Sequence, residues 1–372
     1  MDVKNLIVPK KIAALAPYQA GKPIEELARE FGLDPARIVK LASNENPLGM
    51  PESARQAALE ALTPCARYPD ANGFYLKEAL GAHYHVPLDW LTLGNGSNNI
   101  LNLIAAAFLE PGTAAVYAEH AFTVYKLAVQ QSGARHILVP ARQYGHDLDA
   151  MRAAITPETR VVFVANPNNP TGTFEPGERI EAFVAAIHRE HGERVLIVLD
   201  EAYNEYLPPE LRYDSIDLVR RYPNLIVTRT FSKAYALAGL RVGFAVAHPH
   251  VTDYLNRVRE PFNVSIPAQA AAIAVLQDTE FLERSYQLNR AGLEQLSQAF
   301  QELKLTYVPS HGNFVLLHVG PKAAEINLAL LKRGVIVRPV SGDGLPEWLR
   351  ISVGLPDENQ TFLAALREIL AG

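Results

Sequence analysis

TFSKAYALAGLRVGF, at residues 230–244, follows the apolar, β-branched stretch LIVT at residues 225–228. Such a stretch predicts a buried strand, so Lys233 lies just beyond the strand's carboxyl end. A lysine held there can form a Schiff base with an aldehyde cofactor. The neighbouring side chains that could bind the phosphate of such a cofactor are Thr230, Ser232 and Arg241. An isolated Ser-Lys pair is more often a surface loop, and the rest of the sequence favours the cofactor interpretation.

The chain before and around this stretch alternates short apolar strands with amphipathic helices. Strands are predicted at residues 114–117, 136–139, 160–165, 195–199 and 225–228. Helices are predicted at residues 51–62, 73–84, 98–109, 122–132 and 176–191. This alternation predicts an α/β fold in which a mostly parallel, mixed sheet is covered by helices.

The pattern changes after about residue 266, where it becomes mainly helical up to residue 303. Strands are then predicted at residues 314–319, 335–338 and 349–353, before a final helix. A chain of 372 residues exceeds what one hydrophobic core usually supports, so a second, smaller α+β domain is expected. The expected division is an N-terminal arm at 1–50 that joins the small domain, a large cofactor-binding domain at 51–265, and a small domain at 266–372.

Composition argues against several classes of protein. The net charge is -5 and there is no long basic run, which speaks against nucleic-acid binding. No window approaches the ~20 apolar residues of a membrane span. The single cysteine, Cys65, rules out an internal disulfide framework and fits a reducing compartment. We therefore expect a cytoplasmic protein without nucleic-acid or membrane partners, and no metal site, because the histidines lack metal-binding spacing.

An acid stands directly after the apolar strand at residues 195–199. Burying the Asp200 carboxylate is costly unless it meets a cation, and ligands of α/β sheets bind at the carboxyl ends of strands. Asp200 is therefore a candidate partner for a protonated ring nitrogen, and Tyr203 could reach a hydroxyl on the same ring. A helix N-cap aspartate followed by a core tyrosine explains this segment about as well.

Two polar loops have candidate binding groups. NPNNPTG, at residues 166–172, is a stiff turn in which the Asn169 amide could donate to a ring oxygen or to a substrate carboxylate. GNGSNN, at residues 94–99, precedes an apolar helix, and its glycines would let backbone N–H groups approach an anion. A structural turn is the alternative for both loops, and for the second it is the commoner case.

Three further residues are candidates through their positions. Phe122 begins a helix just after a strand and could stack on a flat ring, although core packing is commoner. Arg338 and Arg350 lie in apolar strands, and buried arginines need anions such as carboxylate or phosphate; structural salt bridges are the alternative. RYPD, at residues 67–70, lies in a loop that a neighbouring subunit could contact.

Together these segments resemble the fold-type I pyridoxal-phosphate aminotransferases, and within them the histidinol-phosphate aminotransferase family. The lysine stretch and PNNPTG are typical of the superfamily, whereas NENP at residues 44–47, RYPD, and LRISVG at residues 349–354 narrow the resemblance. The segments that carry it span nearly the whole chain, at residues 17–19, 21–23, 40–49, 67–70, 167–172, 200–203, 230–244 and 349–354.

The resemblance implies a role for each matching residue. Lys233 is implied as the Schiff-base lysine that also moves the proton, and Asp200 as the partner of the ring nitrogen. The other implied cofactor contacts are Tyr203 and Asn169 at the ring oxygen, Phe122 on the ring face, and Ser97, Asn98, Thr230, Ser232 and Arg241 at the phosphate. The implied substrate contacts are Tyr18, Asn44, Arg338 and Arg350. Asn98 departs from the family pattern, in which an acid often stands at that position or the next.

The resemblance also implies a homodimer, in which Tyr68 reaches across the interface, and a ping-pong reaction on Lys233. That reaction interconverts L-histidinol phosphate and 2-oxoglutarate with imidazole-acetol phosphate and L-glutamate, in histidine biosynthesis. The amine of Lys233 should then have a pKa below the usual ~10.4, because the cofactor and Arg241 are cationic. The alternatives left open are an aromatic amino-acid aminotransferase of the phenylalanine type, a threonine-phosphate decarboxylase, and a catalytically silent homologue.

Overall fold

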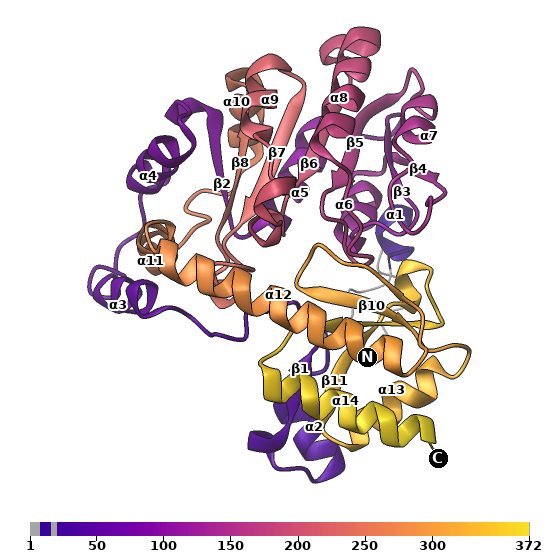
Figure 1. The fold of residues 1–372 in the computed structure, drawn as a ribbon. Coiled ribbons are helices and arrows are strands. Elements are labelled where there is room, and N and C mark those ends of the chain that lie inside the picture. The colour runs from indigo at the N-terminus through magenta and orange to yellow at the C-terminus, as the bar shows by residue number, and fades with distance from the viewer. Residues whose placement is uncertain (1–7, 16–20, 372) are drawn as a thin grey trace.

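The structure is a computed structural model that describes residues 8–15 and 21–371, and it contains two β-sheets with helices packed against them (Figure 1). The larger sheet consists of β2 (Leu91–Gly94), β3 (Ala114–Ala118), β4 (Arg135–Val139), β5 (Thr159–Ala165), β6 (Leu196–Asp200), β7 (Leu225–Thr230) and β8 (Gly243–Ala247). Their spatial order is β2-β8-β7-β6-β5-β3-β4. Strands β3 to β7 pair with one another in parallel, whereas β8 is antiparallel to both of its neighbours, β2 and β7. The predicted mixed, mostly parallel sheet is confirmed.

Helices cover both faces of this sheet, and the residues of β3, β6, β7 and β8 are all buried. The helices between its strands and around it are α3 (Glu52–Glu60), α4 (Phe74–Tyr84), α5 (Ser97–Phe108), α6 (Thr123–Ser132), α7 (Leu148–Ala153), α8 (Gly177–His191), α9 (Ser215–Arg221), α10 (Pro249–Val258) and α11 (Ile266–Leu276). Burial on both faces explains why these strands are continuous apolar runs instead of alternating patterns.

The smaller sheet combines the beginning of the chain with its last third. It consists of β1 (Val39–Leu41), β9 (Tyr307–Val308), β10 (Phe314–His318), β11 (Val335–Pro339) and β12 (Trp348–Ser352), in the order β1-β11-β12-β10-β9. Strand β1 pairs in parallel with β11, so the arm contributes an edge strand. The helices nearby are α2 (Ile24–Phe31), α12 (Thr279–Glu302), α13 (Ala323–Lys332) and α14 (Pro356–Ala371), and a short α1 (Lys10–Ala13) lies beside α6.

The long helix α12 runs along the boundary between the two sheets in Figure 1, where it is orange. Its apolar residues Leu296 and Phe300 are fully buried in the core of the smaller sheet. A separate and larger apolar core surrounds the seven-stranded sheet. The division of the chain at residues 50 and 265 stays a prediction. Among the residues that the structure describes, no helix combines the length and apolar character needed to cross a membrane.

Candidate active site

Almost every predicted site residue lines one cavity of about 330 Å³, which lies where β6 and β7 end and the smaller sheet faces them. The predicted residues in its lining are Asn44, Ser97, Asn98, Phe122, Asn169, Asp200, Tyr203, Thr230, Ser232, Lys233, Arg241, Arg338 and Arg350. Two predicted residues are not among them. Tyr18 lies outside the described residues, and Tyr68 is 80% exposed and does not line the cavity.

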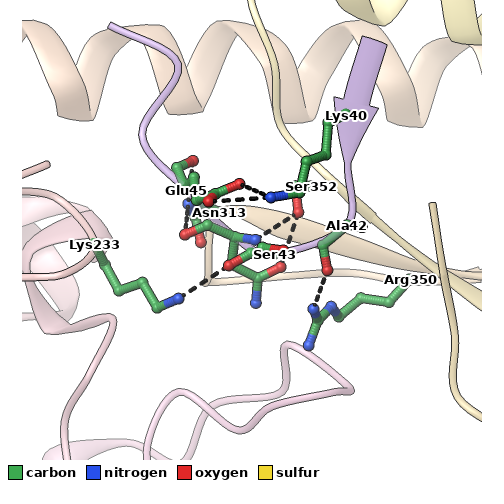
Figure 2. Close-up of polar contacts among 9 residues, drawn as sticks. Lys40, Ala42, Ser43, Glu45, Lys233, Asn313, Arg350 and Ser352 are labelled. Carbon is green, nitrogen blue, oxygen red and sulfur yellow. Dashed lines mark hydrogen bonds and ion pairs between the residues drawn. The ribbon is translucent and has the colours of Figure 1, made fainter. Parts of the chain in front are cut away.

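Lys233 follows β7 and extends into the cavity. Its Nζ donates a hydrogen bond of 3.1 Å to the backbone oxygen of Ser43 (Figure 2). The pKa of Lys233 is lowered to about 7, mainly by burial and then by Arg350, while Glu45 acts in the opposite direction and Arg241 adds a smaller decrease. The predicted direction is confirmed, but the main cause is the loss of hydration and not the neighbouring charge. The amine can therefore both accept and release a proton near neutral pH.

Asp200 is the last residue of β6, and only 4% of it is exposed. One carboxylate oxygen accepts a hydrogen bond of 2.8 Å from the Tyr125 hydroxyl, and the other accepts one of 3.1 Å from Thr228. Burial nevertheless raises the pKa of Asp200 to about 6. A carboxylate in such a site is best stabilised by a cation. Sequence analysis missed Tyr125, although it lies one helical turn after Phe122 and therefore on a neighbouring part of the helix face.

One end of the cavity is built from donors that suit an anion. The backbone N–H groups at the start of α5 point there, as helix N-termini do. The Ser232 hydroxyl accepts a hydrogen bond of 3.1 Å from Arg241 Nη1 and another of 2.9 Å from Thr230. Gly96 has a φ of +75°, and a Cβ at this position would lie 2.2 Å from Arg241 Nη2. Only glycine lets the guanidinium approach the helix start this closely.

Two arginines lie at the end of the cavity formed by the smaller sheet. Arg338 on β11 is directly opposite Arg350 on β12, so both side chains leave the same face of the sheet. Arg350 donates a hydrogen bond of 2.6 Å to Asn169 Oδ1 and another of 2.7 Å to the backbone oxygen of Ala42. Two adjacent guanidinium groups provide a site for carboxylate or phosphate.

The arm crosses the cavity as the segment 42–46, which we call the strap. Asn313 donates to the backbone oxygens of Asn44 and Glu45, and the Glu45 carboxylate pairs with Lys40 at 3.1 Å (Figure 2). At its end, Asn46 donates to the backbone oxygen of Ala234, the residue after Lys233. The strap thus ties the smaller sheet to the lysine loop.

Asn44 was predicted to contact substrate, and in the structure only 1% of it is exposed. Its side chain bonds to Tyr203 and to Ser352. Among the lining residues that sequence analysis missed, four have polar or charged side chains, namely Ser43, Glu45, Thr123 and Asp343. Glu45 lies within the NENP motif, which was a signal that could have identified it.

The surface near Tyr68 is rich in exposed aromatic rings. Tyr68 stacks on Phe262 with a centroid distance of 4.6 Å, and Phe74 contacts Tyr75 edge to face. All four side chains are exposed. We call these residues the aromatic pairs; exposed clusters of this kind mark interaction surfaces.

Comparison with known proteins places this geometry in context. The family model "Aminotransferase class I and II" matches residues 36–366. The chain is 63% identical to histidinol-phosphate aminotransferase 2 of Ralstonia nicotianae over 98% of this chain and 97% of that protein. It is 62% identical to histidinol-phosphate aminotransferase 1 of Cupriavidus pinatubonensis over 97% and 96% of the two chains. The crystal structure of histidinol-phosphate aminotransferase from Sinorhizobium meliloti in complex with pyridoxal-5'-phosphate superposes with a TM-score of 0.89, at 30% identity, over 98% and 97% of the two chains.

Proposed function

This chain belongs to the family of class I and II aminotransferases, and on that premise we propose that it interconverts L-histidinol phosphate and 2-oxoglutarate with imidazole-acetol phosphate and L-glutamate. One observation carries the proposal. Lys233, whose amine titrates near neutral pH, shares a cavity with the buried Asp200 and with a pair of arginines suited to anionic substrates. The relatives named above support the choice of substrate.

The residues of the cavity fit pyridoxal phosphate as cofactor. The anion site at the start of α5, where Gly96 admits Arg241, suits the phosphate group. Asp200 suits a protonated ring nitrogen, because its buried carboxylate needs a cation. Tyr203 and Asn169 could bind the ring oxygen, Phe122 could cover the ring face, and Lys233 is available for the aldehyde. When bound, the cofactor supplies an aldehyde that condenses with amines and a ring that delocalises electrons from the substrate's α-carbon.

The chain's own groups provide the binding and the proton transfer. Lys233 Nζ takes a proton from the substrate's α-carbon and returns one during the second half of the reaction, which its pKa of about 7 favours. Asp200 stays ionised against its cationic partner and keeps that partner charged. Arg350 orients the α-carboxylate when glutamate is bound. The hydrogen bond to Asn169 holds the guanidinium of Arg350 in place. Because both substrates use this one cavity, they bind in turn, as in a ping-pong scheme.

A homodimer is part of the proposal, with Tyr68 contributed to the cavity of the second subunit. The aromatic pairs support it, because Tyr68 is exposed and does not line the cavity of its own chain. We further propose the division into arm, large domain and small domain at residues 50 and 265, supported by the pairing of β1 with β11. A cytoplasmic location completes the proposal, supported by the free thiol of Cys65.

Steady-state kinetics test the substrate assignment. The value of kcat/KM is measured for histidinol phosphate, phenylalanine and tyrosine, each with 2-oxoglutarate as acceptor. We expect histidinol phosphate to be preferred by more than about two orders of magnitude, or ~3 kcal/mol in transition-state binding. Equal or reversed values would instead identify an aromatic amino-acid aminotransferase, and release of carbon dioxide from threonine phosphate without amino transfer would identify a decarboxylase.

A further inference from the structure

A chain of three hydrogen bonds leads from the smaller sheet to the hydroxyl of Tyr203. Ser352, the last residue of β12, accepts a hydrogen bond of 2.8 Å from the backbone N–H of Asn44 and donates one of 2.9 Å to Asn44 Oδ1. Asn44 Nδ2 then donates 2.9 Å to Tyr203 Oη. Asn44, Tyr203 and Ser352 are 1%, 3% and 3% exposed, so water does not compete for these bonds. Figure 2 shows Ser352 beside the strap, on the opposite side from Lys233.

The orientation of the Asn44 amide, with Oδ1 toward Ser352 and Nδ2 toward Tyr203, sets the direction of each bond. The backbone N–H can only donate, so Ser352 is the acceptor there, and because an amide oxygen can only accept, Ser352 donates its own proton to Asn44 Oδ1. This holds the Asn44 amide with its NH₂ group toward Tyr203. An amide NH₂ group can also only donate, so Tyr203 is the acceptor in this bond.

On the basis of the proposed function, we propose that Ser352 and Asn44 are positioning residues that keep Tyr203 a hydrogen-bond donor toward the ring oxygen of pyridoxal phosphate. Tyr203 lines the cavity, and Lys233 Nζ lies 5.9 Å from the centre of its ring. A donor stabilises an ionised ring oxygen, so it lowers the pH at which the lysine-linked cofactor gains or loses its proton. The smaller sheet thereby influences proton transfer on the larger one.

The test follows the visible absorption of the protein loaded with pyridoxal phosphate as the pH is varied. Four forms are compared, namely wild type, Tyr203→Phe, Ser352→Ala and the double variant. Each single substitution should raise the midpoint pH of the absorption change by about one unit, as expected for the loss of one hydrogen bond. The double variant should match Tyr203→Phe alone, because both substitutions remove the same interaction.

Ser285→Ala is the matched control. Ser285 is 2% exposed and accepts 2.8 Å from Asn46 Nδ2, so it holds the same strap without belonging to the hydrogen-bond chain. Its midpoint should equal that of wild type. Equal shifts in Ser285→Ala and Ser352→Ala would mean that loosening the strap is the cause, and this would overturn the proposal. No shift in Ser352→Ala would also overturn it, as would a shift that persists when Tyr203 is already phenylalanine.

Asn44→Asp provides a second variant if Ser352→Ala fails to fold. Its carboxylate would accept the Tyr203 proton, so the midpoint should rise, and this rise should vanish in the Tyr203→Phe background. A rise retained there would come from the added charge and would contradict the proposal.

The charged groups that face this part of the cavity are Glu45, Asp200, Lys233, Arg241, Arg338, Asp343 and Arg350, and none is changed. If the wild-type protein gains no visible absorption with pyridoxal phosphate, the proposed function itself is overturned. If wild type absorbs and Tyr203→Phe shifts as expected but Ser352→Ala does not shift, only this inference is overturned.

Discussion

Lys233 illustrates how burial changes the chemistry of a single side chain. An ordinary lysine is almost fully protonated at neutral pH, whereas Lys233, with a pKa lowered to about 7, is near half protonation. Arg350 disfavours the charged form and Glu45 favours it, so the outcome depends on the arm as well as on the large sheet. The neutral fraction rises as the pH increases through 7.

Trace labelling of the cofactor-free protein with acetic anhydride checks this value. Only neutral amines react, so labelling of Lys233 should rise with pH and reach half its maximum near pH 7. The exposed Lys322 serves as an internal reference in the same digest, read by mass spectrometry. A midpoint for Lys233 close to pH 10 would contradict the burial argument.

At the scale of elements, strands β5 to β7 were predictable because their residues are apolar and buried on both faces. Polar residues that follow such strands meet at one edge of the sheet, so Asp200, Asn169 and Lys233 could be grouped from sequence. Strands β2 and β8 were missed, since each begins or ends with glycine and β2 has only four residues. The contacts of Asn44 could not be predicted, because Ser352 lies 308 residues away along the chain.

The turn between β2 and α5 carries a prediction of its own. In Gly96→Ala, the new methyl group would displace Arg241, because it would lie 2.2 Å from Nη2. We expect the Kd for pyridoxal phosphate to rise at least about tenfold, or ~1.4 kcal/mol, as measured by absorbance titration.

Gly112→Ala is the control for backbone strain alone. Gly112 also has a positive φ, of +96°, but no atom of the described residues lies within 4 Å of the Cβ that alanine would add there. This variant should lose about 1 kcal/mol of stability and bind the cofactor normally. Equal Kd values for the two variants would count against the role given to Gly96.

At the scale of the whole molecule, the aromatic pairs leave four large side chains exposed at the surface. Tyr68 is 80% exposed while it stacks on Phe262, so a partner could bury both rings. A two-fold symmetric dimer would bury the same surface twice. In the proposed homodimer, the exposed loop at residues 67–70 would complete the active site of the partner subunit.

Subunit complementation tests this connection. Lys233→Ala and Tyr68→Ala should each be inactive or strongly impaired as homodimers. When the two are unfolded and refolded together, mixed dimers contain one site with both residues intact, and roughly a quarter of wild-type activity should return. Sedimentation equilibrium checks that the proteins are dimers. No recovery from verified mixed dimers would mean that Tyr68 acts within its own chain.

The pairing of β1 with β11 has a consequence for the synthesis of the protein. Val39 is synthesised well before its partner Val335, and Ser352 is made later still. At about 5–20 residues per second, the arm waits on the order of tens of seconds for its partner strand. The large sheet can form during this interval, but the strap cannot close over it. A nascent chain therefore completes its catalytic cavity only once β11 and β12 have been made, after the strands of the large sheet.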